Sequence, residues 1–348
     1  MPLAVNFPTW LSPEIIPGFP FRWYGLMYLF AFGATYLLFR YQDKRRSHPL
    51  DEDTLSGLFF WTILGLLIGA RVFATLVYDT SGIYLRKPWL VFWPFDGGRF
   101  VGLQGMSYHG GLIGAVLGIV AYCRSRRLNV REIGDLMVAG IPLGYTFGRL
   151  GNFINGELYG RVTTGVLGMI FPHAAPFSAR DQWVRDAAVQ VGIPIPSPDS
   201  LINLPRHPSQ LYEALFEGVV LWAFLWLLRN RKPFKGFLIG MYLIGYGTVR
   251  FVIEYFREPD ADLGYRILLV PTDLPPALFS SVFNFTTGQI LCALMIVSGI
   301  IWLGIAARMP QESPAVQSRP RGGPDASAEG AESTARRKDR RKLRKKLH

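Results

Sequence analysis

The sequence predicts an all-α, polytopic integral membrane protein with about seven transmembrane helices and a small external subdomain. Half of its 348 residues are hydrophobic, long apolar runs recur along the chain, and basic clusters follow alternate runs. The runs are residues 23–39, 55–78, 107–123, 133–147, 210–228, 236–256 and 288–307. Several approach or exceed the roughly 18–20 residues that cross a bilayer core. The run at 133–147 is the weakest, because it is short and contains Pro142.

Basic residues predict the orientation of these helices. Clusters that include Arg45, Arg127 and Arg231 follow the first, third and fifth runs, whereas the loops between them hold fewer basic residues. By the positive-inside rule, the N-terminus faces outward and the C-terminus faces the cytoplasm. Residues 1–20 lack the basic segment of a cleavable signal peptide, so we expect the first run to remain as a membrane anchor.

The domain organisation follows from composition. We expect residues 1–307 to form the membrane-embedded body, with residues 158–207, which contain six prolines, as an external loop subdomain. Residues 308–348 are polar and predict a disordered, basic cytoplasmic tail. Its last 13 residues carry a net +8 of the formal +12. Beside a membrane, this charge favours anionic lipid over nucleic acid, although a merely solvated tail fits equally well.

The most informative segment is Gly148-Arg-Leu-Gly-Asn-Phe-Ile-Asn-Gly-Glu-Leu-Tyr-Gly160, directly after an apolar run. It contains Arg149, Asn152, Asn155 and Glu157. Such groups cost several kcal/mol in hydrocarbon unless they are paired or hydrated, so the segment predicts a functional site. Its glycines allow sharp bends and close approach of the backbone to a ligand.

A second polar segment lies near the predicted outer end of the sixth run. Tyr246, Arg250, Glu254 and Arg257 are spaced so that a helix would stack them on one face. A purely structural alternative is that Arg250 and Glu254 pair with each other.

A third segment, residues 105–111, places His109 among glycines at the start of the third run. Imidazole titrates near neutral pH, so His109 is a candidate proton acceptor, although a lone membrane histidine can also be a helix–helix hydrogen-bonding group. No second ligand stands at metal-binding spacing from it, and Cys123 and Cys292 form no paired motif. We therefore expect no metal site, and we expect both cysteines to behave as small hydrophobic residues.

Two further sets of polar residues are interpreted as mainly structural. The segment 207–213 favours an architectural role, although Gln210 and Glu213 could reach a head group. Arg71 and Asp135 are expected to pair with each other. Arginines that converge in a membrane suit a phosphate, because their planar fork binds its oxygens bidentately. The residues therefore predict a membrane protein that handles phospholipid.

The segment 148–160 closely resembles the signature of the bacterial prolipoprotein diacylglyceryl transferases. Four further segments resemble that family in its order: residues 23–28, 106–111, 207–213 and 246–257. The resemblance implies transfer of the diacylglyceryl group of phosphatidylglycerol to the lipobox cysteine thiol of a prolipoprotein. The products would be a thioether and glycerol phosphate, in the first step of bacterial lipoprotein maturation. It also implies the bacterial inner membrane, no cofactor, and prolipoprotein lipobox peptides and membrane lipids as partners.

The resemblance also implies roles for individual residues. Arg149 and Arg250 would stabilise the leaving phosphate, and His109 would be the base or proton relay, unless an arginine-bound phosphate oxygen or water takes the proton. The substrate-binding residues would be Tyr24, Asn152, Asn155, Glu157, Tyr246, Glu254 and Arg257. Among these, Glu157 and Glu254 would orient the arginines.

Three other classes of protein compete with this interpretation. A lipid or solute transporter would explain charges in the membrane, but it predicts pseudo-symmetric halves that the sequence does not display. A metal-dependent phosphotransferase would need clustered aspartates in the runs. A scaffold would tolerate lysine in place of the arginines.

Overall fold

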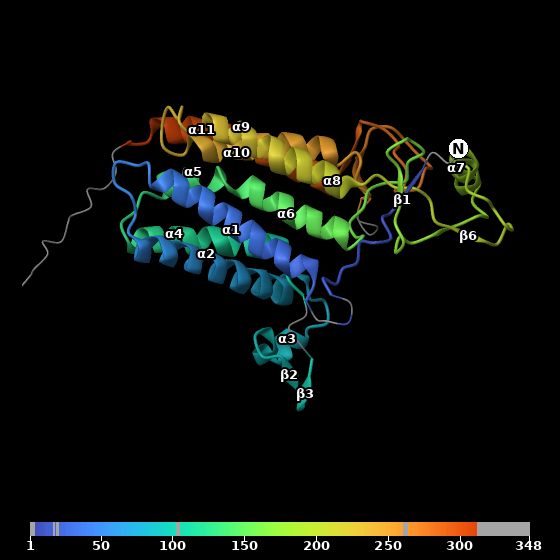
Figure 1. Ribbon diagram of the computed structural model, residues 1–348, viewed down its shortest axis with the longest axis horizontal. Helices are drawn as coiled ribbons and strands as arrows, with labels where there is room; N and C mark the ends of the chain where they lie inside the picture. The colour runs from blue at the N-terminus through green and yellow to red at the C-terminus, as the bar shows by residue number, and fades with distance from the viewer. Residues whose placement is uncertain (1–3, 17, 19–20, 102–104, 260–263, 312–348) are drawn as a thin grey trace, which may run out of the picture. The chain divides into compact units, whose positions relative to one another are not determined.

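The computed structural model describes residues 4–16, 18, 21–101, 105–259 and 264–311, which form a mostly helical structure (Figure 1). The longer helices are α1 (Trp23–Asp43), α2 (Glu52–Phe73), α4 (Tyr108–Ser125), α6 (Ile141–Ile154), α10 (Phe237–Ile253) and α11 (Thr287–Arg308). The shorter helices are α3 (Ile83–Arg86), α5 (Val130–Val138), α7 (Gln182–Val191), α8 (Ser209–Glu213) and α9 (Leu221–Leu228). Two π-helical turns, η1 (Ala74–Tyr78) and η3 (Ala214–Val220), continue α2 and α8, and η2 (Pro88–Val91) is a 3₁₀ turn. The expected basic tail lies outside the described residues.

The helices carry apolar side chains outward and bury polar ones. Leu227 and Leu29 are 74% and 68% exposed, whereas Glu213 and Asp135 are fully buried. Such a surface suits hydrocarbon as its solvent. Within the described chain, three helical segments are long and apolar enough to cross a membrane: Glu52–Tyr78, Ser209–Leu228 and Thr287–Arg308. The helix Phe237–Ile253 is apolar but shorter.

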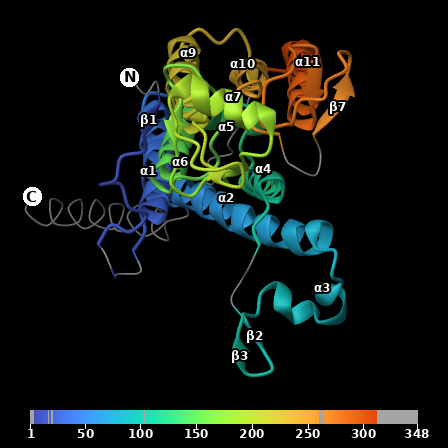
Figure 2. The same ribbon diagram turned by 90° about the vertical axis from the view of Figure 1, so that its right-hand side faces the viewer.

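The helices pack in pairs, α2 with α4, α10 with α11 and α1 with α6 (Figure 1). Glycines bring α2 and α4 together: a Cβ added to Gly114 would lie 2.0 Å from the carbonyl oxygen of Gly65. Backbones approach this closely only where both helices present small residues, as is common in membranes. The segment between these two helices, with α3 and the hairpin of β2 (Phe95–Asp96) and β3 (Arg99–Phe100), projects from their ends (Figure 2).

Two expected helices differ in their limits. The run at 133–147 is broken after Val138, and α6 begins at Ile141, because Pro142 lacks an N–H and fits only a first helical turn. The helix expected over 236–256 ends at Ile253. Beyond it, the carbonyl of Phe256 accepts from the N–H of Arg161, so this backbone pairs with the segment that follows α6 instead of continuing the helix.

The expected pairing of Arg71 with Asp135 is wrong. Arg71 donates to the carbonyls of Val91 at 2.6 Å and Leu90 at 2.9 Å, in the segment that follows α2. Asp135 accepts from the N–H groups of Gly236 and Ile239, at 2.9 and 3.2 Å, and so caps the start of α10. Arg71 is held by backbone carbonyls, and Asp135 by backbone N–H groups and by Lys232, 3.9 Å away, which sequence spacing alone does not reveal.

A small packed region outside the long helices has its own apolar cluster, which includes Val184, Leu204 and Ala277. Its strands are β1 (Val5–Asn6) with β4 (Met169–Ile170), β5 (Phe177–Ser178) with β6 (Leu201–Ile202), and β7 (Tyr265–Leu268) with β8 (Asn284–Thr286). The region therefore draws on the N-terminal segment and on residues after 264, as well as on residues 158–207. It lies at the end of the helices where α6 meets α8 (Figure 1).

Candidate active site

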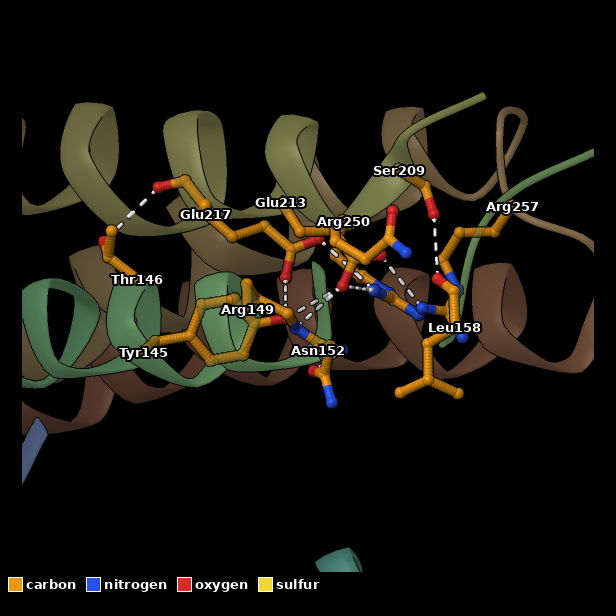
Figure 3. Close-up of polar contacts among 12 residues, drawn as sticks. Tyr145, Thr146, Arg149, Asn152, Leu158, Ser209, Glu213, Glu217, Arg250 and Arg257 are labelled. Atoms are coloured by element: carbon orange, nitrogen blue, oxygen red, sulfur yellow. Dashed lines mark hydrogen bonds and ion pairs between the residues drawn. The ribbon is translucent and has the colours of Figure 1, made fainter. Parts of the chain in front are cut away.

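The site is built where α6 faces the helix formed by α8 and η3. Tyr145, Arg149 and Asn152 lie at i, i+4 and i+7 on α6, and Tyr145 and Arg149 point toward Glu213 and Glu217 (Figure 3). Gly218 allows the two helices to touch, because a Cβ at this position would lie 2.0 Å from Thr146 Oγ1. The close approach brings charged side chains of both helices within hydrogen-bonding distance.

Glu213 is the centre of the ion pairs. Its Oε2 lies 2.8 Å from Nε of Arg149 and 3.1 Å from Nη1 of Arg250, and its Oε1 accepts from Nη1 of Arg257 at 2.9 Å. The carboxylate is fully buried. Three arginines from two parts of the chain, α6 and the end of α10, thus meet on one side chain, as Figure 3 shows.

A second carboxylate, Glu217, lies one turn further along the same helix. Its Oε2 accepts from the hydroxyl of Tyr145 at 2.6 Å, and its Oε1 lies 3.4 Å from Nη1 of Arg250. The Tyr145 hydroxyl in turn accepts from Nε of Arg149 at 2.6 Å. Tyr145 therefore links the two carboxylates to the arginine on its own helix.

Glu254 completes the group of charges. It pairs with Nη2 of Arg250 at 3.1 Å and accepts from Oγ1 of Thr286 at 3.2 Å, where α11 begins. The structural alternative of an Arg250–Glu254 pair is therefore present, but it is only one of the contacts of Arg250. Arg257 lies beyond the end of α10, not on its helical face, and reaches Glu213 from there.

The rest of segment 148–160 forms a turn after α6. Nδ2 of Asn152 and of Asn155 donate to Oε1 of Glu157, at 3.0 and 3.3 Å. Gly156 has a φ of +66°, a conformation that favours glycine. Glu157 thus orients the two asparagines, and it reaches Arg149 only through Asn152, whose Oδ1 accepts from Nη1 of that arginine at 3.4 Å.

The tyrosines expected at the site lie around this centre. Tyr24 on α1 packs beside Gly151 of α6, and its hydroxyl lies 3.1 Å from that of Tyr28. The ring of Tyr246 makes an edge contact with Tyr145 at 6.0 Å between ring centroids. Both tyrosines therefore neighbour α6 without joining the ion pairs.

His109 lies apart from the arginines. Among the described residues, its hydrogen-bond partner is the hydroxyl of Tyr78, 2.9 Å from Nδ1. The adjacent Tyr108 approaches Tyr246 and lies within electrostatic range of Arg149 and Arg250. The turn that carries His109 therefore borders the site, and the tyrosine of that turn lies nearer to the charges.

Polar atoms of both kinds remain without a protein partner at the site. In the part of the chain that the structure describes, one donor, Arg257 Nε, and two acceptors, Asn155 Oδ1 and Gln210 Oε1, are buried without a hydrogen-bond partner. The side chains of Arg149, Arg250 and Arg257 remain 15–18% exposed. Groups of His, Cys, Asp and Glu that could hold a metal ion are absent from the described residues. The three partly exposed guanidinium groups suit an anion with several oxygens, such as a phosphate.

Sequence reasoning missed Glu217 and Tyr145 and gave Glu213 only a possible head-group contact. A signal was present for both glutamates. Glu213 and Glu217 stand four residues apart in the otherwise apolar run 210–228, and a carboxylate inside such a run needs a partner.

The chain is similar to known proteins over most of its length. The family model described as prolipoprotein diacylglyceryl transferase matches residues 13–305. The phosphatidylglycerol–prolipoprotein diacylglyceryl transferase of Treponema denticola is 54% identical over 86% of this chain and 94% of its own length. The enzyme of the same name from Treponema pallidum is 52% identical over the same shares, and that from Chlorobaculum tepidum is 42% identical over 85% and 92%.

Proposed function

The chain belongs to the prolipoprotein diacylglyceryl transferase family, and we propose that the arginine site around Glu213 is where this membrane protein carries out its reaction. The chain is a phosphatidylglycerol–prolipoprotein diacylglyceryl transferase, which acts in lipoprotein maturation. The convergence of Arg149, Arg250 and Arg257 on a single buried carboxylate is the observation that carries the proposal.

Arg149 and Arg250 bind the phosphate of phosphatidylglycerol. Glu213 pairs with both guanidinium groups and Glu254 pairs with that of Arg250, and the remaining N–H donors face the substrate. Asn152 and Asn155, which Glu157 orients, hydrogen-bond the glycerol head group together with Tyr24 and Tyr246. As the carbon–oxygen bond breaks, negative charge grows on the phosphate, and the arginines stabilise that charge in a water-poor site.

The nucleophile comes from the second substrate. The lipobox cysteine thiol loses its proton, its sulfur attacks the glyceryl carbon that bears the phosphate oxygen, and glycerol phosphate leaves with the bonding electron pair. A thiol has an ordinary pKa of about 8.5, so a base assists this step. We assign His109 as that base or proton relay. For this role its Nδ1 donates to the Tyr78 hydroxyl, 2.9 Å away, which leaves Nε2 free to accept the proton.

The finer topology is also part of the proposal. About seven transmembrane helices cross the bacterial inner membrane, with the N-terminus outside and the C-terminus in the cytoplasm. Residues 1–307 form the catalytic body, and the external region around residues 158–207 meets the arriving lipobox peptide. The basic tail, residues 308–348, contacts anionic membrane lipid. The reaction uses no cofactor, metal or nucleic acid.

The proposal is tested with the purified chain in detergent, phosphatidylglycerol and a synthetic lipobox peptide. The mass of the peptide and the release of glycerol phosphate are measured for the wild type and for Arg149→Ala, each with a Cys peptide and a Ser peptide. A diacylglyceryl mass gain that disappears with either change supports the assigned site. Full activity of a folded Arg149→Ala variant would overturn it.

A further inference from the structure

We propose that Glu213 is a positioning residue that gathers the three arginines and, as their shared counter-charge, limits how tightly the site binds the anionic head group. The inference rests on the proposed function, because it assumes that the phosphate is bound by these arginines. Besides the residues that contact the substrate, it assigns one residue that sets the affinity for the head group and the release of the product.

The geometry singles out Glu213 among the carboxylates of the site. Glu217 pairs with Arg250, and Glu254 pairs with Arg250 and Arg257. Within the described chain, Glu213 is the carboxylate that lies within 3.1 Å of a nitrogen of all three arginines. Its removal would therefore leave three cations without their common partner.

The three arginines keep Glu213 ionised, and its burial holds this counter-charge in place. The side chain is fully buried, whereas the arginines are partly exposed. It stands at the end of α8, and the contact of Gly218 with Thr146 on the next turn holds this helix against α6. A phosphate that binds at the exposed side of the arginines therefore contacts arginines that remain paired with Glu213 on their buried side.

The consequence is a balance between attraction and release. Arg149, Arg250 and Arg257 are matched by Glu213, Glu217 and Glu254, so the ion-pair cluster is close to neutral. A cluster with uncompensated charge would hold both phosphatidylglycerol and the more highly charged product, glycerol phosphate, more tightly. Tighter binding of the product slows turnover, because the product must leave before the next lipid enters.

The test compares Glu213→Gln with Glu132→Gln in the full chain, assayed as above. Loss of the Glu213 charge is expected to lower the KM for phosphatidylglycerol and the inhibition constant of added glycerol phosphate by at least about fivefold, with a lower kcat. Glu132→Gln is the matched control, since it removes a carboxylate on α5, outside the site, that pairs with Arg46 and Lys235. It is expected to change both constants by less than about twofold.

A folded Glu213→Gln enzyme whose KM and inhibition constant stay unchanged or rise would overturn the inference, because a merely structural role predicts weaker binding. Should Glu213→Gln fail to fold, Glu213→Asp keeps the charge but shortens the reach. Its kcat is expected to fall while the inhibition constant of glycerol phosphate stays near the wild-type value, and a fall in that constant would count against the role of charge. An active Arg149→Ala variant would instead reject the proposed site itself.

Discussion

Two regions of the molecule bury arginines in different ways. In the loop region, the small packed region that includes residues 158–207, Arg161 and Arg206 are each 2% exposed. Arg161 donates to the carbonyls of Pro276 at 3.0 Å and Leu278 at 2.8 Å, and Arg206 pairs with Glu258 and lies over the ring of Tyr159. In the helical region, Arg149, Arg250 and Arg257 instead share one carboxylate and stay partly exposed.

The difference separates arginines that brace loops from arginines that bind a substrate. A guanidinium whose donors end on backbone carbonyls substitutes for missing secondary structure and has little left to offer a ligand. A guanidinium held from one side by a carboxylate keeps its charge, its orientation and donors on the other side. Partial exposure and the type of partner therefore carry more information than burial alone.

The largest expected effect is at the helical site. Arg250→Lys keeps the positive charge but loses the planar fork, so it cannot hold Glu213, Glu254 and a phosphate together. We expect kcat/KM to fall by about 100-fold with little change in melting temperature. The control is Arg161→Lys in the loop region, which makes the same exchange at an arginine outside the site. Activity of Arg250→Lys within a few-fold of the wild type would remove the distinction between the two regions.

The next largest expected effect is a loss of stability from a substitution in the loop region. Arg161→Met leaves the carbonyls of Pro276 and Leu278 without their donor. We expect a loss of about 3 kcal/mol in the unfolding free energy of this region. Limited proteolysis of the loop region measures this loss of stability. Activity per intact molecule should stay near that of the wild type, and a selective loss of kcat with unchanged protease resistance would argue for a catalytic role.

Much of this distinction was predictable from the sequence, but not all of it. Arg149 and Arg250 stand out because charges in apolar runs need a reason, and the structure brings them together on one carboxylate. Glu217 was equally visible in its run, but its partners are far away in sequence and depend on which helices pack. Arg161 and Arg206 gave no signal, because their partners, which are backbone carbonyls, aromatic rings and Glu258, lie in irregular segments.

A smaller effect is expected from Gly288 on α11, which touches the site without carrying charge. A Cβ there would lie 2.6 Å from Oε1 of Glu254, so Gly288→Ala must push this carboxylate away from Arg250. Because the carboxylate can shift, we expect a fall in kcat of roughly threefold to tenfold and a stability loss of no more than about 1 kcal/mol. Gly33→Ala, at an open helical position on α1, controls for the loss of a glycine. Unchanged kinetics of Gly288→Ala would show that Glu254 does not orient the arginines.

The smallest expected effect is a pH dependence that separates the regions, since arginines do not titrate and His207 does. His207 packs against Phe256 and joins the loop region to α8. Burial lowers the pKa of its imidazole. Its neutral form is therefore favoured in the folded state. The stabilisation is complete above about pH 6.5 and declines as the pH falls toward the lowered value, by less than about 1 kcal/mol. Melting curves at pH 7.5 and 5.5 should show this decline in the wild type and in the exposed-site control His173→Gln, but less of it in His207→Gln. An equal decline in all three proteins would place the acid sensitivity elsewhere, whereas its loss in His207→Gln alone would locate it at the junction and leave the arginine site independent of pH in this range.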